Sequence, residues 1–173
     1  FYVMRGRKIP VSTLIPASEW LYDYYGKMGY ATVFDYTSEH YTILDKSVAD
    51  HFRMEAIREE GMLTDDVFNY FQSMMRLRPC CVLHEREDFE VIVESLRMDG
   101  GALIVVYSDK NIVGMAFAEP RGNHALVLDG MYNSEDVKRV ALWGVMKYLD
   151  AAEIYCRVLP SGKADEHRGM ARV

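Results

Sequence analysis

The sequence predicts an α/β (α+β) fold: a mixed, largely antiparallel sheet flanked by helices. Two observations carry this prediction. The first is a run of three strand-like segments separated by short polar turns, which is typical of antiparallel hairpins: 102–107, 112–118 and 124–131. The second is a helical pattern from Ser134 to Leu149, followed by a strand-like segment from Glu153 to Leu159. Three antiparallel strands, a crossover helix and a further strand favour a mixed sheet with helices on its faces.

The N-terminal part of the chain predicts a strand, a helix and a second strand. Residues 11–16 predict a short buried strand. A stripe at helical spacing predicts a helix over 19–28 whose apolar side faces the core: Trp20, Leu21, Tyr24, Tyr25 and Met28. Ser18 is placed to cap this helix, and Gly29 is placed to end it. Residues 31–37 predict the next strand, with 40–44 as its continuation or its partner.

The middle of the chain predicts mainly helices. We expect one helix over 46–60, where Gly61 ends it, and a second after Thr64, which is placed as its cap. After Arg78 and Pro79 the pattern changes, and a strand-like stretch from Cys80 to Leu83 precedes a helix near 86–98.

These elements divide into three expected segments. Residues 1–44 form one unit, 45–79 a helical connector, and 80–173 a second module. The first residues resemble the last turn of a helix, and 169–173 resemble the beginning of a strand. We therefore expect the chain to be part of a longer protein.

Composition excludes several classes of protein. The net charge of −6 argues against a nucleic-acid binder, because phosphate backbones favour clustered Lys and Arg. No apolar run approaches the roughly 20 residues that a membrane-spanning helix needs. Three cysteines give no disulfide framework, so a reducing, cytoplasmic location fits best. The five histidines are scattered without ligand spacing, and we expect no metal.

The stretch from Ile15 to Tyr30 resembles the GNAT (Gcn5-related N-acetyltransferase) family. In that family a strand carries acetyl-coenzyme A along its edge, and a short helix then ends in a pattern like Tyr-Glu-Lys-Leu-Gly-Phe. The segment Tyr25-Gly-Lys-Met-Gly-Tyr30 matches this ending in order and spacing. The order of the later elements resembles a second, degenerate GNAT unit. The resemblance thus implies a tandem GNAT protein, of which this chain holds two partial units.

The resemblance implies roles for individual residues. Tyr25 occupies the position of the family's proton donor, and a phenol with an ordinary pKa of about 10 keeps its proton at neutral pH. The alternative is that Tyr25 is one of several aromatic rings in the core. Backbone groups of Leu14, Ile15 and Ala17 would line the pantetheine arm of the cofactor. Ser18 falls where many members have an Asn that bonds this arm. Ser18 also has the alternative role of a helix cap. The general base stays unassigned, with Glu39 and His40 as guesses.

The phosphate-binding loop of the family is not recognisable in the second module. Between the third strand and the helix from Ser134 stands Gly130-Met-Tyr-Asn-Ser-Glu-Asp136. Two carboxylates in the first turn of a helix would repel a pyrophosphate that the helix dipole otherwise attracts. We expect the second module not to bind coenzyme A there. A related spacing at 166–171 has Glu where a cation or amide belongs.

The leading interpretation is an N-acetyltransferase that moves an acetyl group from acetyl-coenzyme A to an amine on a small molecule or peptide, with no nucleic acid or membrane as partner. The alternative is a non-catalytic structural or protein-interaction module. A homo-oligomer in which a second copy supplies missing elements is a third alternative.

Overall fold

The computed structural model describes residues 6–42, 46–78, 81–158 and 166–172. The described residues separate into two compact units, one of Phe1–Ser38 with Val158–Val173 and one of Glu39–Arg157. In this division the C-terminal strand lies with the first unit. Each unit is described by itself below.

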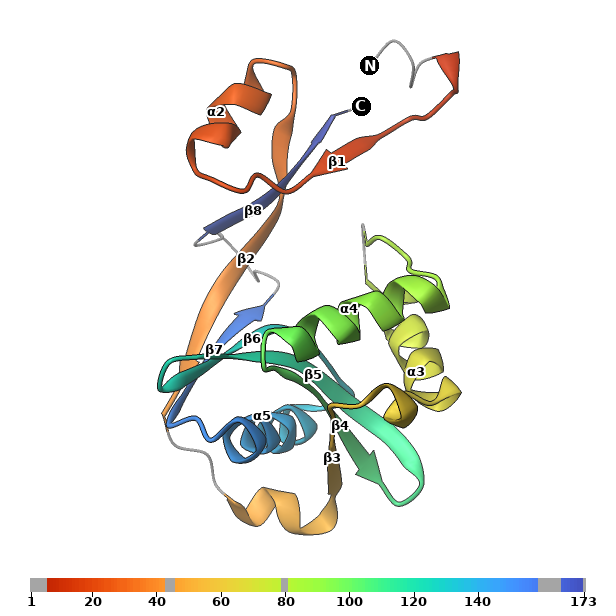
Figure 1. The fold of residues 1–173 in the computed structure, drawn as a ribbon, viewed down its shortest axis with the longest axis vertical. Coiled ribbons are helices and arrows are strands. Elements are labelled where there is room, and N and C mark those ends of the chain that lie inside the picture. The colour runs from red at the N-terminus through yellow and green to blue at the C-terminus, as the bar shows by residue number, and fades with distance from the viewer. Residues whose placement is uncertain (1–5, 43–45, 79–80, 159–165, 173) are drawn as a thin grey trace. The chain divides into compact units, whose positions relative to one another are not determined.

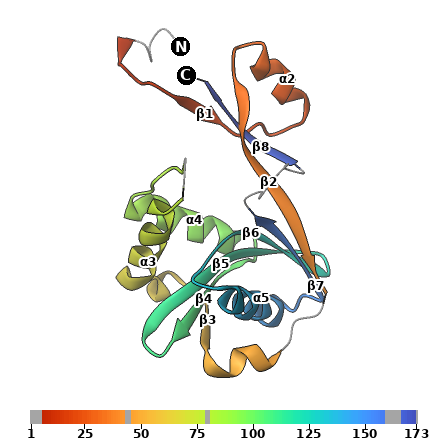
Figure 2. The ribbon, with the colours of Figure 1, turned by 180° about the vertical axis from the view of Figure 1, so that it is seen from behind.

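Three strands and one helix form the first unit. The strands β1 (Ser12–Leu14), β8 (Glu166–Arg172) and β2 (Ala31–Tyr41) are antiparallel, and β8 lies between the other two (Figures 1 and 2). The register pairs Leu14 with Met170 on one side of β8, and Ala31 with Ala171 on the other. The helix α2 (Trp20–Gly26) connects β1 to β2. The strand expected at 31–37 continues to Tyr41 as one element, and its last three residues belong to the second unit. Residues 43–44 of the expected continuation lie outside the described residues.

The helix α2 differs from the expected core helix. None of its residues is buried, and Trp20 is 65% exposed, Tyr24 46% and nearby Met28 43%. Only Leu21 and Tyr25 of the predicted stripe are half-buried. A helix of seven residues against a small three-stranded sheet has too little opposing surface to cover a stripe that wide. Helical spacing therefore located the helix correctly and placed its apolar side wrongly.

The second unit is built on a sheet in the order β7-β6-β5-β4-β3, with the end of β2 beside β7. Its strands are β3 (Arg53–Ile57), β4 (Ala102–Ser108), β5 (Asn111–Arg121), β6 (His124–Tyr132) and β7 (Glu153–Val158). The first four are successively antiparallel, and β6 and β7 are parallel. The predicted hairpins and the mixed sheet are confirmed. Helix α5 (Glu135–Leu149) makes the crossover between the parallel strands.

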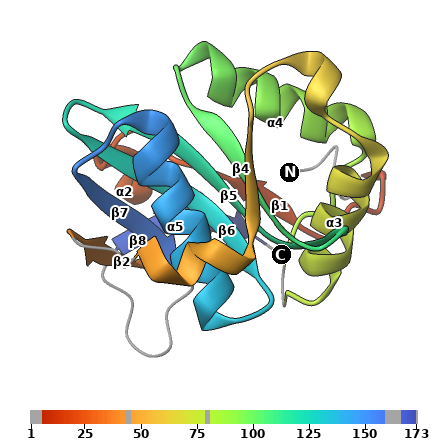
Figure 3. The ribbon, with the colours of Figure 1, turned by 90° about the horizontal axis from the view of Figure 1, so that it is seen from below.

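Helices cover both faces of this sheet (Figure 3). Helices α3 (Asp65–Arg76) and α4 (Arg86–Met98) cover one face, where a cluster of aromatic and aliphatic side chains packs around Phe71, Phe89 and Phe117. Helix α5 covers the other face with a buried side of small and branched residues: Val137, Val140, Ala141, Leu142, Gly144 and Val145. Because helices cover both faces of the sheet, strands β4 and β5 are buried on both sides. This burial matches their continuous hydrophobic runs.

Two predicted elements are wrong. Residues 46–60 form a short 3-10 helix η1 (Lys46–His51), the strand β3 and part of the 3-10 helix η2 (Glu60–Met62), instead of one α-helix. The four-residue spacing of Val48, Phe52 and Ala56 mimics a helix. Strand β4, however, offers unpaired backbone groups at its edge, and Arg53–Ile57 pairs with them. The segment Cys81–Leu83 forms no strand, and both Val82 and Leu83 are more than half exposed. Cys80 lies outside the described residues.

Candidate functional site

The segment that follows β1 brings together four of the residues implied by the resemblance. Leu14 ends β1 and is half-buried, whereas Ile15 is 68% exposed, and Ala17 and Ser18 are exposed as well. One edge of β1 is paired with β8. Among the described residues no strand pairs with its other edge, where β1 ends the strand order. Backbone N–H and C=O groups on this edge are thus free of β-ladder bonds within the described chain, as a linear amide-containing ligand would require.

Tyr25 is held in a small aromatic cluster near this strand. Its ring makes edge contacts with Tyr24 and Tyr30, at centroid distances of 5.2 and 5.9 Å. The Tyr30 hydroxyl in turn lies 2.7 Å from Oγ of Ser12, on β1. The chain Ser12–Tyr30–Tyr25 therefore ties the strand to the helix that carries the predicted proton donor. Sequence reasoning missed Ser12 and Tyr30, although Tyr30 is the last residue of the matched motif.

Ser18 does not cap α2 as expected. The N-cap residue is Glu19, whose backbone is helical, and no side-chain hydrogen bond forms there. The carbonyl of Ser18 accepts the N–H of Leu21 at 3.0 Å instead. The hydroxyl of Ser18 is therefore not used as a helix cap.

The second unit contains a polar network that the sequence did not reveal. Lys138, on α5, donates to Glu39 Oε2 at 2.6 Å, and the Tyr41 hydroxyl donates to the same oxygen at 2.7 Å. The Lys138 side chain is only 14% exposed. Burial lowers its pKa, but hydrogen bonds to Glu39 and Tyr41 outweigh this and raise the pKa above its ordinary value. Burial raises the pKa of Glu39, but its two hydrogen bonds outweigh that effect and lower it.

Cys156 and Tyr132 lie beside this network. Burial raises the pKa of the Cys156 thiol to about 12, with a smaller lowering contribution from Lys138. Burial, followed by the charges of Cys156 and Asp129, raises the pKa of Tyr132 well above its ordinary value. Cys156 lies on β7, where it is the register partner of Val127 on β6.

The expected acidic start of α5 is present. Ser134 is the N-cap residue, and its side chain accepts from the N–H of Val137 at 3.3 Å. Glu135 and Asp136 occupy the first turn. One donor of this helix start is thus already bonded, and two negative charges flank the others. The arrangement opposes binding of a phosphate group.

Glu39 and His40, the two guesses for a general base, both have partners. Glu39 is bonded to Lys138 and Tyr41, as described above. His40 Nε2 lies 3.0 Å from Glu153 Oε2, and its ring stacks on Tyr155 at a centroid distance of 4.4 Å. Each side chain thus already has a polar contact, Glu39 through Oε2 and His40 through Nε2.

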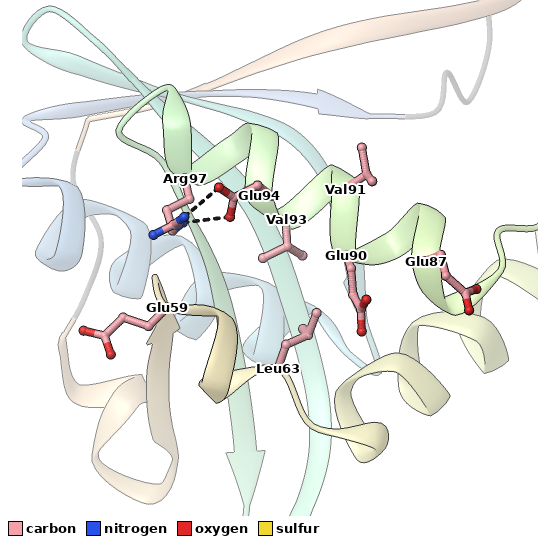
Figure 4. A pocket seen from close by; sticks show the side chains of 8 residues that line it. All are labelled: Glu59, Leu63, Glu87, Glu90, Val91, Val93, Glu94 and Arg97. Atoms are coloured by element: carbon pink, nitrogen blue, oxygen red, sulfur yellow. Dashed lines mark hydrogen bonds and ion pairs between the residues drawn. The ribbon is translucent and has the colours of Figure 1, made fainter.

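A third feature of the second unit is a groove of about 480 Å³ between α4 and the segment around η2 (Figure 4). Its apolar residues are Leu63, Val91 and Val93, and its charged residues are Glu59, Glu87, Glu90, Glu94 and Arg97. Arg97 donates to Glu94, and Figure 4 shows both bonds. Four carboxylates against one paired guanidinium make this groove unsuited to the phosphates of an acyl-coenzyme A.

Arg78, which follows α3, bonds to two residues of β6. Its two Nη atoms donate to Asp129 at 2.7 and 2.8 Å, and Nη2 also donates to the carbonyl of Gly130. A bidentate pair of this kind fixes the end of β6. The sequence did not indicate this role of Arg78, which was noted only for its position before Pro79.

The described part of the chain contains neither a candidate metal site nor a candidate membrane-spanning helix. Residues 6–42, 46–78, 81–158 and 166–172 contain no cluster of three or more His, Cys, Asp or Glu that could hold a metal ion. None of the helices described is long and apolar enough to cross a membrane. The segment 166–171 forms strand β8 rather than a phosphate-binding loop.

The fold can be compared with solved structures. A GCN5-related N-acetyltransferase from Kribbella flavida matches with a TM-score of 0.59 at 16% identity, over 99% of this chain and 45% of that chain. A conserved Enterococcus faecalis protein, named as a probable N-acyltransferase, gives 0.67 at 12% identity, over 99% and 47%. A GCN5-related N-acetyltransferase from Anabaena variabilis gives 0.65 at 13% identity, over 99% and 48%.

These likenesses define the class of fold. The chain has the GNAT fold, that of the GCN5-related N-acetyltransferases, which confirms the expected resemblance at the level of fold. The chain spans about half the length of these three proteins. No protein-family model and no curated protein matches the sequence. The tandem arrangement and the residue roles stay predictions.

Proposed function

We propose that this chain is part of an N-acyltransferase in which acetyl-coenzyme A lies along β1 and Tyr25 supplies a proton. One observation carries the proposal. Ser12 on β1 and Tyr25 on α2 are connected through Tyr30, by one hydrogen bond and one ring contact. The strand with a free edge and the helix with the phenol are thereby held in one cluster.

The residues of the first unit suit such a ligand. Backbone groups of Leu14, Ile15 and Ala17 lie at or just beyond the end of β1, on a strand whose outer edge no described strand occupies. The exposed Ser18 hydroxyl can hydrogen-bond an amide of the pantetheine arm, because it does not cap α2. Acetyl-coenzyme A, when bound, supplies an activated acetyl thioester. Tyr25 would then protonate the departing sulfur as the acceptor amine takes its place.

The second unit has a supporting role in this proposal. Lys138, Glu39, Tyr132 and Cys156 interact with one another in this unit. The helix that follows β6 begins with Glu135 and Asp136. Both features oppose a second coenzyme A molecule, so we expect one molecule bound per chain.

The test uses the purified protein with acetyl-coenzyme A and a panel of primary amines, and measures release of the coenzyme A thiol. Tyr25→Phe removes the hydroxyl and keeps the ring contacts. General acid catalysis contributes about 10²- to 10⁴-fold, so kcat should fall by about that factor. Tyr24→Phe is the matched control, because it removes the neighbouring hydroxyl from the same helix, and it should keep kcat within about threefold.

Calorimetric titration separates binding from chemistry. Tyr25→Phe should bind acetyl-coenzyme A with the affinity of the wild type, because the hydroxyl acts on the leaving group. If the whole protein that contains this chain neither binds acetyl-coenzyme A nor acetylates an amine, the proposed function is wrong.

A second candidate is the non-catalytic interaction module. The observation in its favour is the apolar surface of the first unit, where Val11, Ile15, Trp20, Tyr24 and Val33 are all at least 46% exposed. Exposed apolar surface of this kind marks contact sites. Concentration-dependent association in sedimentation experiments, without affinity for acetyl-coenzyme A, would support this candidate instead.

A further inference from the structure

The helix α2 ends at Gly26, and Lys27 is its C-cap residue. The last turn before this cap contains no basic residue. The chain leaves the helix through Gly29, which has a φ of +85°, a left-handed conformation that glycine adopts without strain. The N–H groups of Met28 and Tyr30 both bond to the carbonyl of Tyr25, at 2.9 and 3.2 Å. The backbone of Tyr25 is therefore part of the turn that ends the helix.

Arg172 reaches this turn from β8. Its Nη1 donates to the carbonyl of Met28. Its side chain also lies against Gly29, because a Cβ at Gly29 would be 3.4 Å from Nε and 3.5 Å from Cζ of Arg172. A guanidinium at this place bonds a terminal carbonyl and opposes the negative end of the helix dipole. A residue 144 positions away in sequence thus completes the C-terminal cap of α2.

Arg172 is also connected to Tyr25 through strand β1. Arg172 is the register partner of Ser12 in the antiparallel pair of β8 and β1. Ser12 bonds to Tyr30, and the ring of Tyr30 contacts that of Tyr25. Arg172 therefore lies where two connections meet, one through the backbone of α2 and one through β1.

We propose that Arg172 is a positioning residue that fixes α2, and with it the phenol of Tyr25, relative to β1. The inference rests on the proposed function of Tyr25. The side chain of Arg172 acts on the end of α2 and has no part in the chemical step. Without Arg172 the turn from Met28 to Tyr30 opens more often, and the phenol spends less time where it can protonate a leaving group.

The first test does not depend on activity. Hydrogen exchange of the whole protein reports on the amides of Met28, Gly29 and Tyr30, all of which are hydrogen-bonded in this turn. Arg172→Ala should speed their exchange by about 3- to 10-fold, and Arg172→Lys, which keeps a donor and the charge, should restore most of the protection. Arg97→Ala is the matched control, since it removes an arginine from an exposed pair with Glu94 in the second unit, and it should leave these amides unchanged.

The second test uses turnover. Arg172→Ala should lower kcat by about 10- to 100-fold with little change in the KM for acetyl-coenzyme A, because misplacement affects the chemical step. In the double variant Tyr25→Phe, Arg172→Ala, the second substitution should add almost nothing, because Arg172 acts through the Tyr25 hydroxyl. Thermal unfolding followed by circular dichroism shows whether each variant is folded. If Arg172→Ala is not, Arg172→Gln, which removes the charge but keeps a long polar side chain, takes its place with the same expected direction of change.

The outcomes separate this inference from the proposed function. If Tyr25→Phe leaves kcat unchanged, the role of Tyr25 is wrong and the positioning role falls with it, although the exchange result still shows whether Arg172 caps α2. If Tyr25→Phe lowers kcat but Arg172→Ala changes neither exchange nor kcat, the inference is overturned. A further loss in the double variant would also overturn it, because Arg172 would then act elsewhere.

Discussion

Lys138 Nζ lies 2.6 Å from Oε2 of Glu39, a residue 99 positions earlier in the chain. The contact joins helix α5 to the end of β2 inside the second unit. Because the Lys138 side chain is 14% exposed and that of Glu39 38%, the lysine depends on the pair more than the carboxylate does.

Lys138→Met should therefore destabilise the protein less than Lys138→Ala, and removal of either charge should cost about 1–2 kcal/mol of unfolding free energy. The variant Glu39→Gln leaves the ammonium group without its anion. Urea unfolding of the wild type, Lys138→Met, Glu39→Gln and the double variant of these two gives the coupling free energy. We expect a coupling of about 1 kcal/mol, and strictly additive single effects would contradict a stabilising pair.

The same pair should make stability depend on pH. The pKa of Glu39 is lowered from 4.5, so its contribution is fully present above that value and is lost as pH falls through the lowered pKa. The pKa of Lys138 is raised from 10.5, so its contribution is present below that value and is lost as pH rises through the raised pKa. The difference in unfolding free energy between wild type and Glu39→Gln should be constant from about pH 6 to 9 and shrink in acid.

Urea midpoints measured at several pH values test this prediction, with Arg97→Ala as the control for a surface ion pair. A difference that grows as pH falls below 4.5 would have the wrong sign for a lowered carboxyl pKa.

Cys156 should be unreactive while the protein is folded. With a pKa of about 12, roughly one thiol in ten thousand is ionised at pH 8, and the side chain is buried. Cys81 is half-buried and donates to the carbonyl of Met75 at 2.9 Å. In a Cys80→Ser background, an aromatic disulfide reagent should label one thiol in the native protein and a second only in urea. Equal rates for both thiols would contradict this burial of Cys156.

Two glycines of the first unit should respond to alanine in opposite directions. A Cβ at Gly169, on β8, would lie 2.8 Å from Cδ2 of Phe34 and 3.3 Å from the carbonyl oxygen of Leu14. Gly169→Ala should cost about 1–3 kcal/mol of stability, because the flanking strands must separate. A Cβ at Gly26, on α2, meets nothing within 4 Å, and Gly26→Ala should gain up to about 0.5–1 kcal/mol from helix propensity. Thermal unfolding compares the two, and a destabilising Gly26→Ala would show that α2 is covered in solution.

Local pattern accounts for much of the second unit. The hairpins of β4, β5 and β6 follow from short apolar runs with turn residues between them, and Asp109 adopts the left-handed conformation that such a turn requires. Helix α5 follows from apolar spacing and from Ser134 as its cap. Residues close in sequence decide these elements, so the sequence alone predicts them.

The candidate site was predictable only in part. The motif ending at Tyr30 pointed to Tyr25 and to the end of β1, because family spacing is preserved there. Ser12 and Arg172, which hold that helix, had no signal in sequence, since each acts through a partner at least 18 positions away. Glu39 was considered as a base, whereas the structure pairs it with Lys138.

The sequence by itself determined the class of fold, the hairpins, helices α3, α4 and α5, and the order of strand, helix and strand around Tyr25. The tertiary structure decided which apolar residues are covered, that Arg53–Ile57 is a strand, and that β8 lies between β1 and β2. The physical reason is the same in each case. Helical and strand periodicities are properties of neighbouring residues, whereas an unpaired strand edge, a helix end or a buried charge is satisfied by whichever distant group the fold brings to it.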